Sequence, residues 1–379
     1  MNYINKYKLI ESYLFTQIKL DNEYKIPNNI FRSIIKFVLL KYLIKEIKKN
    51  KIDILIYQFY NYDYINILNK LTFFKTIFYN HSCFLYWIYL DLYKVFSNLY
   101  NSFKNSKYVI SLLPFENNYL FKKWGIKSIL MNNFITYEYK KVIPSNLSSK
   151  TILMIGRGSD RLKRFELGIK AMKYITYEIP DCQMKIISDL SQLDLLINLV
   201  KILKLENFIK FVGYTPIPEI YFKNASLHIF PTISESFGLS LSETKLYGIP
   251  SILCGIDYLS IINGGIIIIY DDEPRSISKQ SLKILKNENY RKKLGKEARE
   301  SMYKFQNEIT LKKWIKLIIS IYKGYNYYKE LTNYDKILSE NQSLNIIKNQ
   351  INLLRMRNPN LKNLTFKDVE NFTFMENLK

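Results

Sequence analysis

Short apolar runs alternate with longer segments of helical period along most of this chain, and this alternation constrains the fold more than any other feature of the sequence. Strands that are separated by helices usually pair in parallel and are covered by those helices. The sequence therefore predicts an α/β fold with parallel sheets. The runs that we interpret as strands are 52–59, 76–79, 108–112, 128–131, 151–155, 183–187, 208–212, 227–230, 251–253 and 266–270.

The strands fall into two sets, which predicts two domains. Residues 140–150 separate the sets and have the Pro, Ser and Asn content of a linker. With 379 residues, of which 48% are hydrophobic, the chain can supply a core for each domain. We expect a first Rossmann-like domain over 1–147, a second over 148–328, and a ligand in the cleft between them. The polar residues 329–379 are expected to form a helical or partly disordered tail.

The cysteines and the apolar segments favour a cytoplasmic protein. Cys83, Cys182 and Cys254 lie far apart, without the paired spacing of a zinc site or of a disulfide framework. The start of the chain lacks the continuous apolar core of a signal peptide, and lysines interrupt the apolar stretch 33–44. We interpret this stretch as an amphipathic helix that covers a core, in preference to one that lies on a membrane surface. No segment is expected to span a membrane.

The net charge of +23 has two explanations. Lys and Arg exceed Asp and Glu by 56 to 33, which favours anionic partners such as nucleic acid, a lipid surface or phosphorylated substrates. The positive charge is spread along the chain, however, and the sequence is crowded with Ile, Asn, Lys and Tyr, as AT-rich codons would produce. The charge by itself therefore leaves the partner open.

The segment 231–250 contains the best clue to the chemistry. Glu235 lies in the loop after the strand 227–230, and Glu243 lies in the helix that follows. Open parallel sheets bind their ligands beyond the carboxyl ends of the strands. Two carboxylates at this edge can accept hydrogen bonds from two different groups of hydroxyls. The structural alternative is a pair of exposed charges, one at the start of the helix and one on its surface.

A second loop, after the strand 151–155, combines glycine with positive charge. Gly156 lets a ligand come close to the backbone, and the start of the next helix offers free N–H groups to anions. Arg157 and Lys163 can neutralise a diphosphate, because a guanidinium grips oxygens in two places and an ammonium acts as a mobile point charge. Taken alone, a solvated basic loop is the simpler interpretation. Both loops leave strands at the same edge of the sheet, so cations and carboxylates are expected to meet there.

With these two loops, the sequence resembles the family 4 (group 1) retaining glycosyltransferases of the GT-B fold. Their carboxyl-terminal domains carry a Gly-Arg loop with a following Lys, and two glutamates separated by seven residues. The resemblance covers about residues 50 to 310 and is strongest from 151 to 255. It implies that Glu235 contacts the hydroxyls of the donor sugar and that Glu243 contacts the ribose of the nucleotide. It assigns the diphosphate to Arg157 and Lys163, and a close backbone approach to Phe237, Gly238 and Leu239.

The two histidines have different expected roles. His81 follows the strand 76–79, at a carboxyl end that faces the predicted cleft. A histidine at the matching place of the resembled family lies near the reacting sugar, so we assign His81 a role in contacting or positioning the sugar, in preference to a purely structural role. The predicted catalytic residues are Glu235 and His81. His228 lies inside the strand 227–230, where a buried and hydrogen-bonded core histidine is expected.

The resemblance implies a metal-independent, hexosyltransferase-like enzyme. It would move a sugar from a nucleoside diphosphate sugar to a glycan or lipid-linked acceptor with retention of configuration. Arg157 and Lys163 would stabilise the charge that builds on the departing phosphate. The donor is a substrate, and no cofactor is predicted. A glycosidase with paired carboxylates ranks lower, because hydrolysis does not explain the cationic loop.

The first domain departs from the family pattern, in which a strand, a Gly-rich loop and a helix open the domain. Nothing like that loop precedes residue 50, so we expect an incomplete or altered first domain. The alternative function is a noncatalytic nucleotide-sugar-binding protein or a basic protein associated with nucleic acid, and nucleic acid ranks last among the partners. Its binding would weaken steeply with salt, whereas a transferase binds a nucleotide sugar saturably. An acidic acceptor or peripheral contact with a membrane would explain the surplus positive charge.

Overall fold

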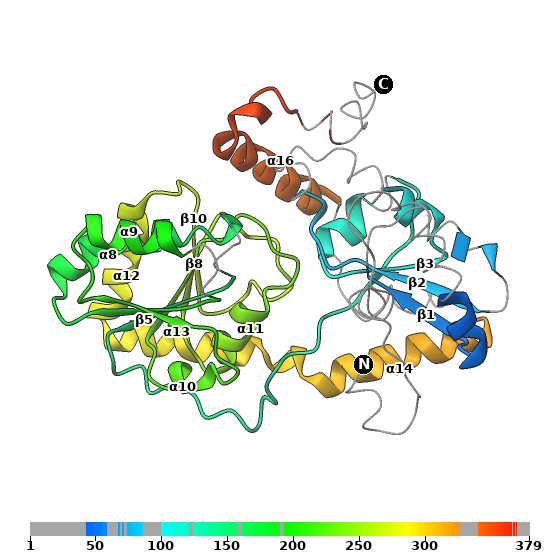
Figure 1. Ribbon diagram of the computed structural model, residues 1–379, viewed down its shortest axis with the longest axis horizontal. Coiled ribbons are helices and arrows are strands. Elements are labelled where there is room, and N and C mark those ends of the chain that lie inside the picture. Colours follow the sequence, from blue (N-terminus) through cyan, green and yellow to red (C-terminus); the bar gives the residue numbers. More distant parts are fainter. Residues whose placement is uncertain are drawn as a thin grey trace, which may run out of the picture.

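The computed structural model describes residues 43–58, 67–68, 70–71, 74–85, 100–120, 124–157, 161–189, 193–325, 340–365, 367 and 369. These residues form two parallel β-sheets with helices packed around them, as the alternating pattern predicts (Figure 1). Each described strand begins and ends within two residues of a predicted run. The predicted helix over 33–44 lies almost entirely outside the described residues, which begin with a helical segment over 43–49.

The first sheet contains four strands in the order β1-β2-β3-β4, all parallel. Both faces of β3 are buried, as is usual for a parallel strand covered by helices, and its polar residue Ser111 is hydrogen-bonded to Glu116. The parallel arrangement brings the carboxyl ends of the strands to one edge. The strands are β1 (Ile54–Tyr57), β2 (Lys75–Tyr79), β3 (Tyr108–Ser111) and β4 (Ile129–Leu130).

The second sheet contains six parallel strands in the order β10-β9-β8-β5-β6-β7. The chain starts in the middle with β5, builds outward through β6 and β7, and then crosses to β8 on the other side of β5. The direction of winding therefore reverses between β5 and β8, and such a switch point opens a crevice for ligands. The strands are β5 (Thr151–Ile155), β6 (Gln183–Ile187), β7 (Ile209–Gly213), β8 (Leu227–Phe230), β9 (Ser251–Cys254) and β10 (Ile266–Ile269).

Helices cover both faces of the second sheet and form with it the second lobe. One core contains the apolar face of α8, including Ile169 and Met172, against Ile152 of β5. Between β10 and α13 the chain forms α12, whose Ile277 and Ile284 join the same core. The helices are α8 (Phe165–Glu178), α9 (Asp194–Ile202), α10 (Glu219–Phe222), α11 (Leu239–Leu246), α12 (Pro274–Lys286) and α13 (Glu288–Ser301).

The chain then returns to the first sheet, which forms the first lobe together with the segments packed on it. Helix α14 (Asn307–Lys323) runs below that sheet in Figure 1. The ring of Trp314 packs edge-on against Tyr79 of β2, at 5.4 Å between ring centroids, and the ammonium of Lys75 donates to the carbonyl of Tyr322 at 2.9 Å. Helix α16 (Glu340–Arg357) lies above the junction of the two lobes. The described part of the predicted tail is thus helical, and its Ile347 is fully buried.

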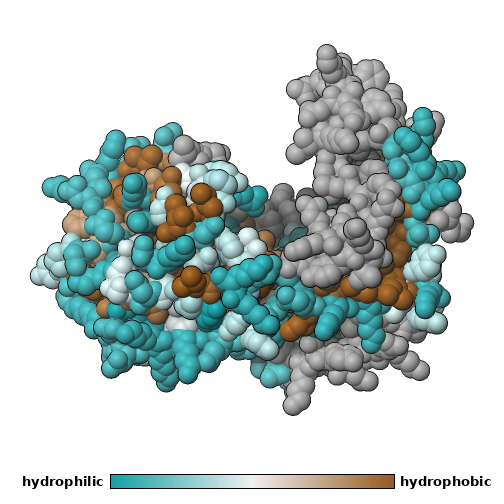
Figure 2. All heavy atoms as spheres, turned by 90° about the horizontal axis from the view of Figure 1, so that it is seen from below, coloured by the Kyte–Doolittle hydropathy of each residue, from teal (hydrophilic) through white to brown (hydrophobic). Residues whose placement is uncertain are grey.

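A single core joins the lobes across their junction. It includes Phe78 of β2, Leu241 of α11 and Ile351 of α16, and all three are almost completely buried. Away from the core the surface is mixed. Figure 2 shows hydrophilic side chains interspersed with small hydrophobic patches on one face of the second lobe, in keeping with a charge that is spread along the chain.

Candidate functional site

The two loops identified in the sequence leave the second sheet on either side of its switch point. The loop with Gly156, Arg157 and Lys163 follows β5, and the loop with Glu235 follows the neighbouring strand β8. This neighbourhood arises because β8 crosses over to pair with β5, so that two segments far apart in the sequence share one edge of the sheet. The arrangement gives both loops access to the place where open α/β sheets bind ligands.

The ammonium of Lys163 forms an ion pair with Oε1 of Glu235. Both side chains are largely shielded, with 15% and 18% of their surfaces exposed. The aliphatic part of Lys163 crosses Gly156 closely, because a Cβ atom at that glycine would lie 3.1 Å from Cγ of the lysine. Glycine therefore permits the approach of a side chain that carries positive charge to the switch point.

Arg157 is exposed and directly follows β5. Its neighbours Gly158, Ser159 and Asp160 lie outside the described residues. The chain is described again in a short 3₁₀ turn, Arg161–Lys163, that precedes α8. The predicted cationic loop thus contributes one exposed and one shielded cation to the same edge of the sheet.

Phe237, Gly238 and Leu239 connect the Glu235 loop to α11, and each has a different environment. Phe237 is buried and packs edge-on against Phe305, at 6.1 Å between ring centroids. Gly238 has φ 80°, a left-handed conformation that L-residues with a side chain rarely adopt. Leu239 begins the helix and is 46% exposed. The ring of Phe237 fixes the loop in the core, and the glycine supplies the backbone conformation that the helix start requires.

Glu243 lies in α11 and faces the segment between the two sheets. Its Oε1 accepts a hydrogen bond from the hydroxyl of Thr136, and Glu219 is near enough to act on it electrostatically. Burial raises the pKa of Glu243, the nearby Glu219 acts in the same direction, and the bond from Thr136 opposes both. Tyr137 donates to Oε2 of Glu219 at 2.9 Å. Glu243 therefore has polar neighbours that differ from those of the Lys163–Glu235 pair.

His81 brings the first lobe into contact with the Glu235 loop. Its backbone carbonyl accepts a hydrogen bond from the hydroxyl of Ser236. The ring packs against Tyr79, at 4.0 Å between centroids, and burial lowers the pKa of His81 to about 4. The imidazole is therefore neutral at neutral pH, and its Nε2 has no hydrogen-bond partner among the described residues. Such a ring can donate or accept a hydrogen bond without adding charge.

His228 is a core residue, as expected. Its Nδ1 lies 3.1 Å from the hydroxyl of Thr244 and 3.3 Å from that of Ser251, and the side chain is fully buried. Burial lowers the pKa of His228 to about 3. The ring packs between β8, β9 and α11 and thereby helps to fix the helix that carries Glu243.

The structure adds buried titratable side chains that sequence patterns did not reveal. Lys245 is fully buried in α11 and donates to the carbonyls of Ile261 and Asn263, the latter at 2.6 Å. From the sequence, a lysine in this helix would be expected to lie on the surface. Glu116 is buried in the first lobe, next to Phe115 of the junction. Neither residue belongs to a motif, because some of the groups that satisfy them come from other segments of the chain, such as the backbone of Phe84 for Glu116.

An ionic cluster fixes α16 to the second lobe. Asp272 lies between two guanidinium groups, with Arg164 Nη2 at 3.0 Å from Oδ1 and Arg357 Nε at 2.6 Å from Oδ2. Gln350 lies about two turns before Arg357 on the same face of α16, and its side chain donates to the carbonyl of Gly255 at 2.7 Å. Burial raises the pKa of Asp272, but the bonds from Arg357 and Arg164 outweigh it and hold the pKa below its usual value. The tail helix is therefore anchored near the carboxyl ends of β9 and β10.

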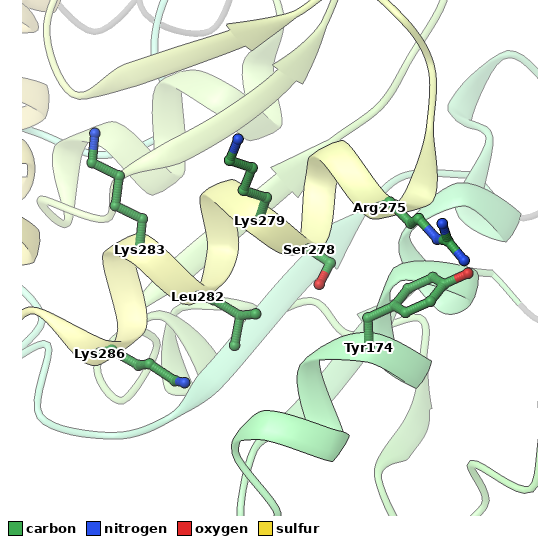
Figure 3. Close-up of a pocket in the computed structure, with 7 residues that line it drawn as sticks. All are labelled: Tyr174, Arg275, Ser278, Lys279, Leu282, Lys283 and Lys286. Atoms are coloured by element: carbon green, nitrogen blue, oxygen red, sulfur yellow. The ribbon is translucent and has the colours of Figure 1, made fainter.

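A cavity of about 470 Å³ lies away from these loops, between α8 and α12 (Figure 3). Two of the cationic side chains that line it have partners nearby. Arg275 stacks over the ring of Tyr174 at 5.5 Å, and Lys286 forms an ion pair with Glu178 at 2.7 Å. We therefore place the candidate site at the switch point of the second sheet, where the two predicted loops and His81 meet.

The side chains and helices of the described residues bear on metal binding and on membrane crossing. Within the ranges that the structure describes, no three or more His, Cys, Asp or Glu side chains are grouped so that they could hold a metal ion. In the same ranges, none of the helices combines the length and the apolar character needed to cross a bilayer. Cys83, Cys182 and Cys254 are buried and are not joined in disulfides.

Comparisons with known proteins point to one kind of enzyme. Residues 136–301 match the family model described as "Glycosyl transferases group 1". The poly(glycerol-phosphate) alpha-glucosyltransferase of Bacillus subtilis is 26% identical over 188 residues, which cover 48% of this chain and 26% of that protein. The chain thus aligns with only about a quarter of the length of this relative.

Solved structures of glycosyltransferases share the fold. Sucrose-phosphate synthase from Thermosynechococcus elongatus has a TM-score of 0.64 at 17% identity, over 79% of this chain and 81% of that one. HepE from Anabaena, in complex with UDP and glucose, has a TM-score of 0.60 at 12% identity, over 80% and 88% of the two chains. At these identities the likeness concerns the fold, which is that of two Rossmann-like domains in the GT-B arrangement.

Proposed function

We propose that this protein transfers a hexose from a nucleoside diphosphate sugar to a glycan or lipid-linked acceptor, because residues 136–301 match the group 1 glycosyltransferase model and the chain has the GT-B fold. We further propose that transfer retains the configuration of the sugar and needs neither a metal ion nor a cofactor. The observation that carries the proposal is the Lys163–Glu235 pair at the switch point, beside the His81 loop.

Donor binding would exchange the partners of this pair. A diphosphate is a stronger partner for an ammonium than a single carboxylate, and Arg157 lies at the same edge to share the charge. Once Lys163 turns to the phosphates, Glu235 is free to accept hydrogen bonds from the hydroxyls of the sugar. The ion pair therefore holds the ammonium of Lys163 and the carboxylate of Glu235 in the orientation that the donor requires. Their opposite charges compensate each other until the donor binds.

The remaining predicted residues have complementary roles in this proposal. Gly238 lets the donor approach the backbone, and the amino terminus of α11 favours the negative charge of the phosphates. Glu243 accepts hydrogen bonds from the ribose in exchange for the one from Thr136. The neutral ring of His81 contacts the sugar from the first lobe. As the bond between sugar and phosphate breaks, Arg157 and Lys163 stabilise the departing phosphate electrostatically.

The acceptor is proposed from charge and from the named relative. The relative from Bacillus subtilis is described as acting on poly(glycerol-phosphate), which is an anionic polymer. A net charge of +23 would attract an anionic acceptor or the surface of an anionic membrane. We therefore propose an anionic glycan or an anionic lipid-linked glycan as acceptor, reached by peripheral contact with a membrane in the second case.

A screen of nucleotide sugars, beginning with UDP-glucose, tests the proposal. We expect saturable binding by calorimetry and slow hydrolysis of the donor, both unchanged by EDTA. Arg157→Ala should weaken binding, and Glu235→Gln should lower turnover by about 100-fold. Glu206→Gln, at an exposed position of the second lobe, is the matched control and should change neither.

The outcomes separate the possible functions. If no nucleotide sugar binds, or if Glu235→Gln and Arg157→Ala behave like the intact protein, this site is not a donor site. Saturable binding without hydrolysis or transfer would favour a noncatalytic nucleotide-sugar-binding protein. Activity that disappears with EDTA and returns with a divalent ion would contradict metal independence.

A further inference from the structure

Three contacts join the lobes beside the candidate site. The hydroxyl of Ser236 donates to the carbonyl of His81, and the hydroxyl of Ser260 donates to the carbonyl of Leu112 at 3.0 Å. The ring of Tyr258 packs edge-on against Phe115, at 5.2 Å between centroids. The separation between the His81 loop and the Glu235 loop is thus set by groups at this junction.

Glu116 lies behind the His81 loop, and 1% of its surface is exposed. Its Oε1 accepts from the backbone N–H of Phe84 at 2.9 Å, and its Oε2 accepts from the hydroxyl of Ser111 at 3.1 Å. Cys83 also forms a hydrogen bond with the carboxyl. Glu116 thereby connects the end of β3 to the segment that directly follows His81.

Burial determines the charge of this carboxyl. It raises the pKa of Glu116 to about 8, although the hydrogen bonds from Phe84, Ser111 and Cys83 act in the opposite direction. Glu116 is therefore mostly protonated at neutral pH. A glutamine could reproduce this neutral form. Its amide oxygen can accept from Phe84, and its amide nitrogen can donate to the hydroxyl oxygen of Ser111, whose proton can then be donated to the carbonyl of Leu113.

Tyr258 continues the polar contacts from the first lobe into the second. Its side chain is 3% exposed, and its hydroxyl oxygen lies 3.4 Å from the backbone nitrogen of Glu235, which donates to it. The hydroxyl also forms hydrogen bonds with Ser234 and with Cys83. Cys83 therefore lies between Glu116 and Tyr258, and a buried line of polar groups runs from the end of β3 to the backbone of Glu235.

We propose that Glu116 and Tyr258 are positioning residues that, through Cys83, hold the His81 loop and the Glu235 loop at the separation required for transfer. This inference rests on the function proposed above. Buried polar groups that satisfy one another fix a single arrangement, because any other leaves some of them unpaired. Misplacing a reacting group by about 1 Å can cost about 100-fold in rate, so a residue that touches no substrate can still control turnover.

The competing explanation is that Glu116 only stabilises the first lobe. Asn117 provides the matched control, because it is the next residue and is 9% exposed. Its amide donates to the carbonyl and to the hydroxyl of Ser128, both at 2.9 Å. These bonds hold the segment before β4 and do not reach the His81 loop. Loss of either side chain should destabilise the lobe, but only loss of Glu116 should affect the geometry of the site.

The test measures the dissociation constant of UDP-glucose, or of the donor found by the screen, together with kcat for transfer or donor hydrolysis. Glu116→Ala should lower kcat about 10- to 100-fold with a donor dissociation constant within about 3-fold of the intact protein. Glu116→Gln should restore kcat to within about 3-fold, and Asn117→Ala should leave it within the same range. Tyr258→Phe should lower kcat, and adding it to Glu116→Ala should lower kcat little further, since both break one line of contacts.

Hydrogen exchange provides a readout that needs no activity. Glu116→Ala should accelerate exchange of the amides at 83–85 and of the Glu235 amide, whereas Asn117→Ala should not affect Glu235. The proposal is overturned if Glu116→Ala leaves that amide unchanged, if the alanine and glutamine variants lose kcat equally, or if the effects of Glu116→Ala and Tyr258→Phe are additive. If no nucleotide sugar binds the intact protein, the proposed function fails, and faster exchange at Glu235 would still show the structural connection.

Discussion

The two lobes differ in how much of each is formed by one continuous stretch of the sequence. The second lobe forms its sheet, its helices and the Lys163–Glu235 pair from one continuous stretch of chain, between β5 and α13. The first lobe has a smaller sheet and is completed by segments that come later in the sequence, including α14, α16 and the loop with Tyr258. The proposed donor site therefore lies within one stretch of chain, whereas the surroundings of His81 depend on segments from several parts of the sequence.

This difference predicts that the lobes lose stability separately. The first lobe shares its core with α16, which is held to the second lobe by the cluster around Asp272. Breaking that cluster should loosen the first lobe before the second. The changes that follow test this asymmetry, beginning with the largest expected effect.

Asp272→Asn should cost about 3–5 kcal/mol of unfolding free energy, because it leaves the guanidinium groups of Arg164 and Arg357 together without their shared carboxylate. Asparagine preserves the size of the side chain and tolerates the positive φ of 53° at this position. Denaturant unfolding measures the loss, and hydrogen exchange locates it. Protection should fall in β1–β4 and α16 while β5 and β6 keep theirs. Glu273→Gln, exposed and next in sequence, should change the stability by less than about 0.5 kcal/mol.

Lys163→Met should lower donor turnover by about 10²- to 10³-fold. Methionine keeps the apolar contact across Gly156 and removes the charge that would stabilise the departing phosphate. Lys170→Met removes an exposed lysine of α8 and should leave turnover unchanged. Steady-state kinetics with the identified donor measures both variants. Equal turnover in the two variants would mean that the second lobe does not contain the reacting site.

Lys245 should make the stability depend on pH in the alkaline range. Burial, and to a smaller extent Lys304, lowers the pKa of Lys245 to about 7, from 10.5 in an exposed lysine. Between these values the unfolded chain binds more protons than the folded one, so stability should rise with pH, by at most about 1.4 kcal/mol per pH unit. Below pH 7 the lysine is charged in both states and this slope disappears.

Lys245→Met should remove the rise of the unfolding free energy with pH between about pH 7 and 10.5. Thermal or denaturant unfolding at several pH values measures this change. The control is Lys201→Met at an exposed position of α9, which should keep the slope of the intact protein. An unchanged slope in Lys245→Met would show that another group is responsible. The prediction bears on the comparison of the lobes, because Lys245 holds the carbonyls of Ile261 and Asn263 in the loop that contacts the first lobe.

The sequence predicted the parts of the molecule that have local signals. Apolar runs gave the described strands, because burial of a parallel strand requires a continuous apolar segment. The loop with Gly238 was recognisable because only glycine adopts its conformation easily and because a helix follows at once. Carboxylates and cations at the ends of neighbouring strands were expected to meet, and Glu235 and Lys163 do so.

The remaining features depend on contacts between distant segments. Glu116 stands between a buried phenylalanine and an asparagine and has no sequence signature, because its partners follow β2 and end β3. Asp272 meets Arg357 only after the chain has returned through α14 and α16. The sequence of the tail showed scattered apolar residues and gave no indication that they would be buried in a shared core. The roles of the site residues in donor binding also stay predictions until a donor is found.

The smallest expected effect isolates the junction itself. The hydroxyl of Ser260 donates to the carbonyl of Leu112 at 3.0 Å, and Ser260→Ala removes this bond without creating a large cavity. We expect a loss of about 1 kcal/mol, concentrated in the first lobe, because the second lobe keeps all of its internal bonds. Ser276→Ala is the control, since its hydroxyl bonds Asp271 within the second lobe. If hydrogen exchange shows both variants loosening the same lobe, the two lobes share their stability more evenly than their contacts indicate. If only Ser260→Ala exposes β3, the first lobe depends on the second for the geometry around His81.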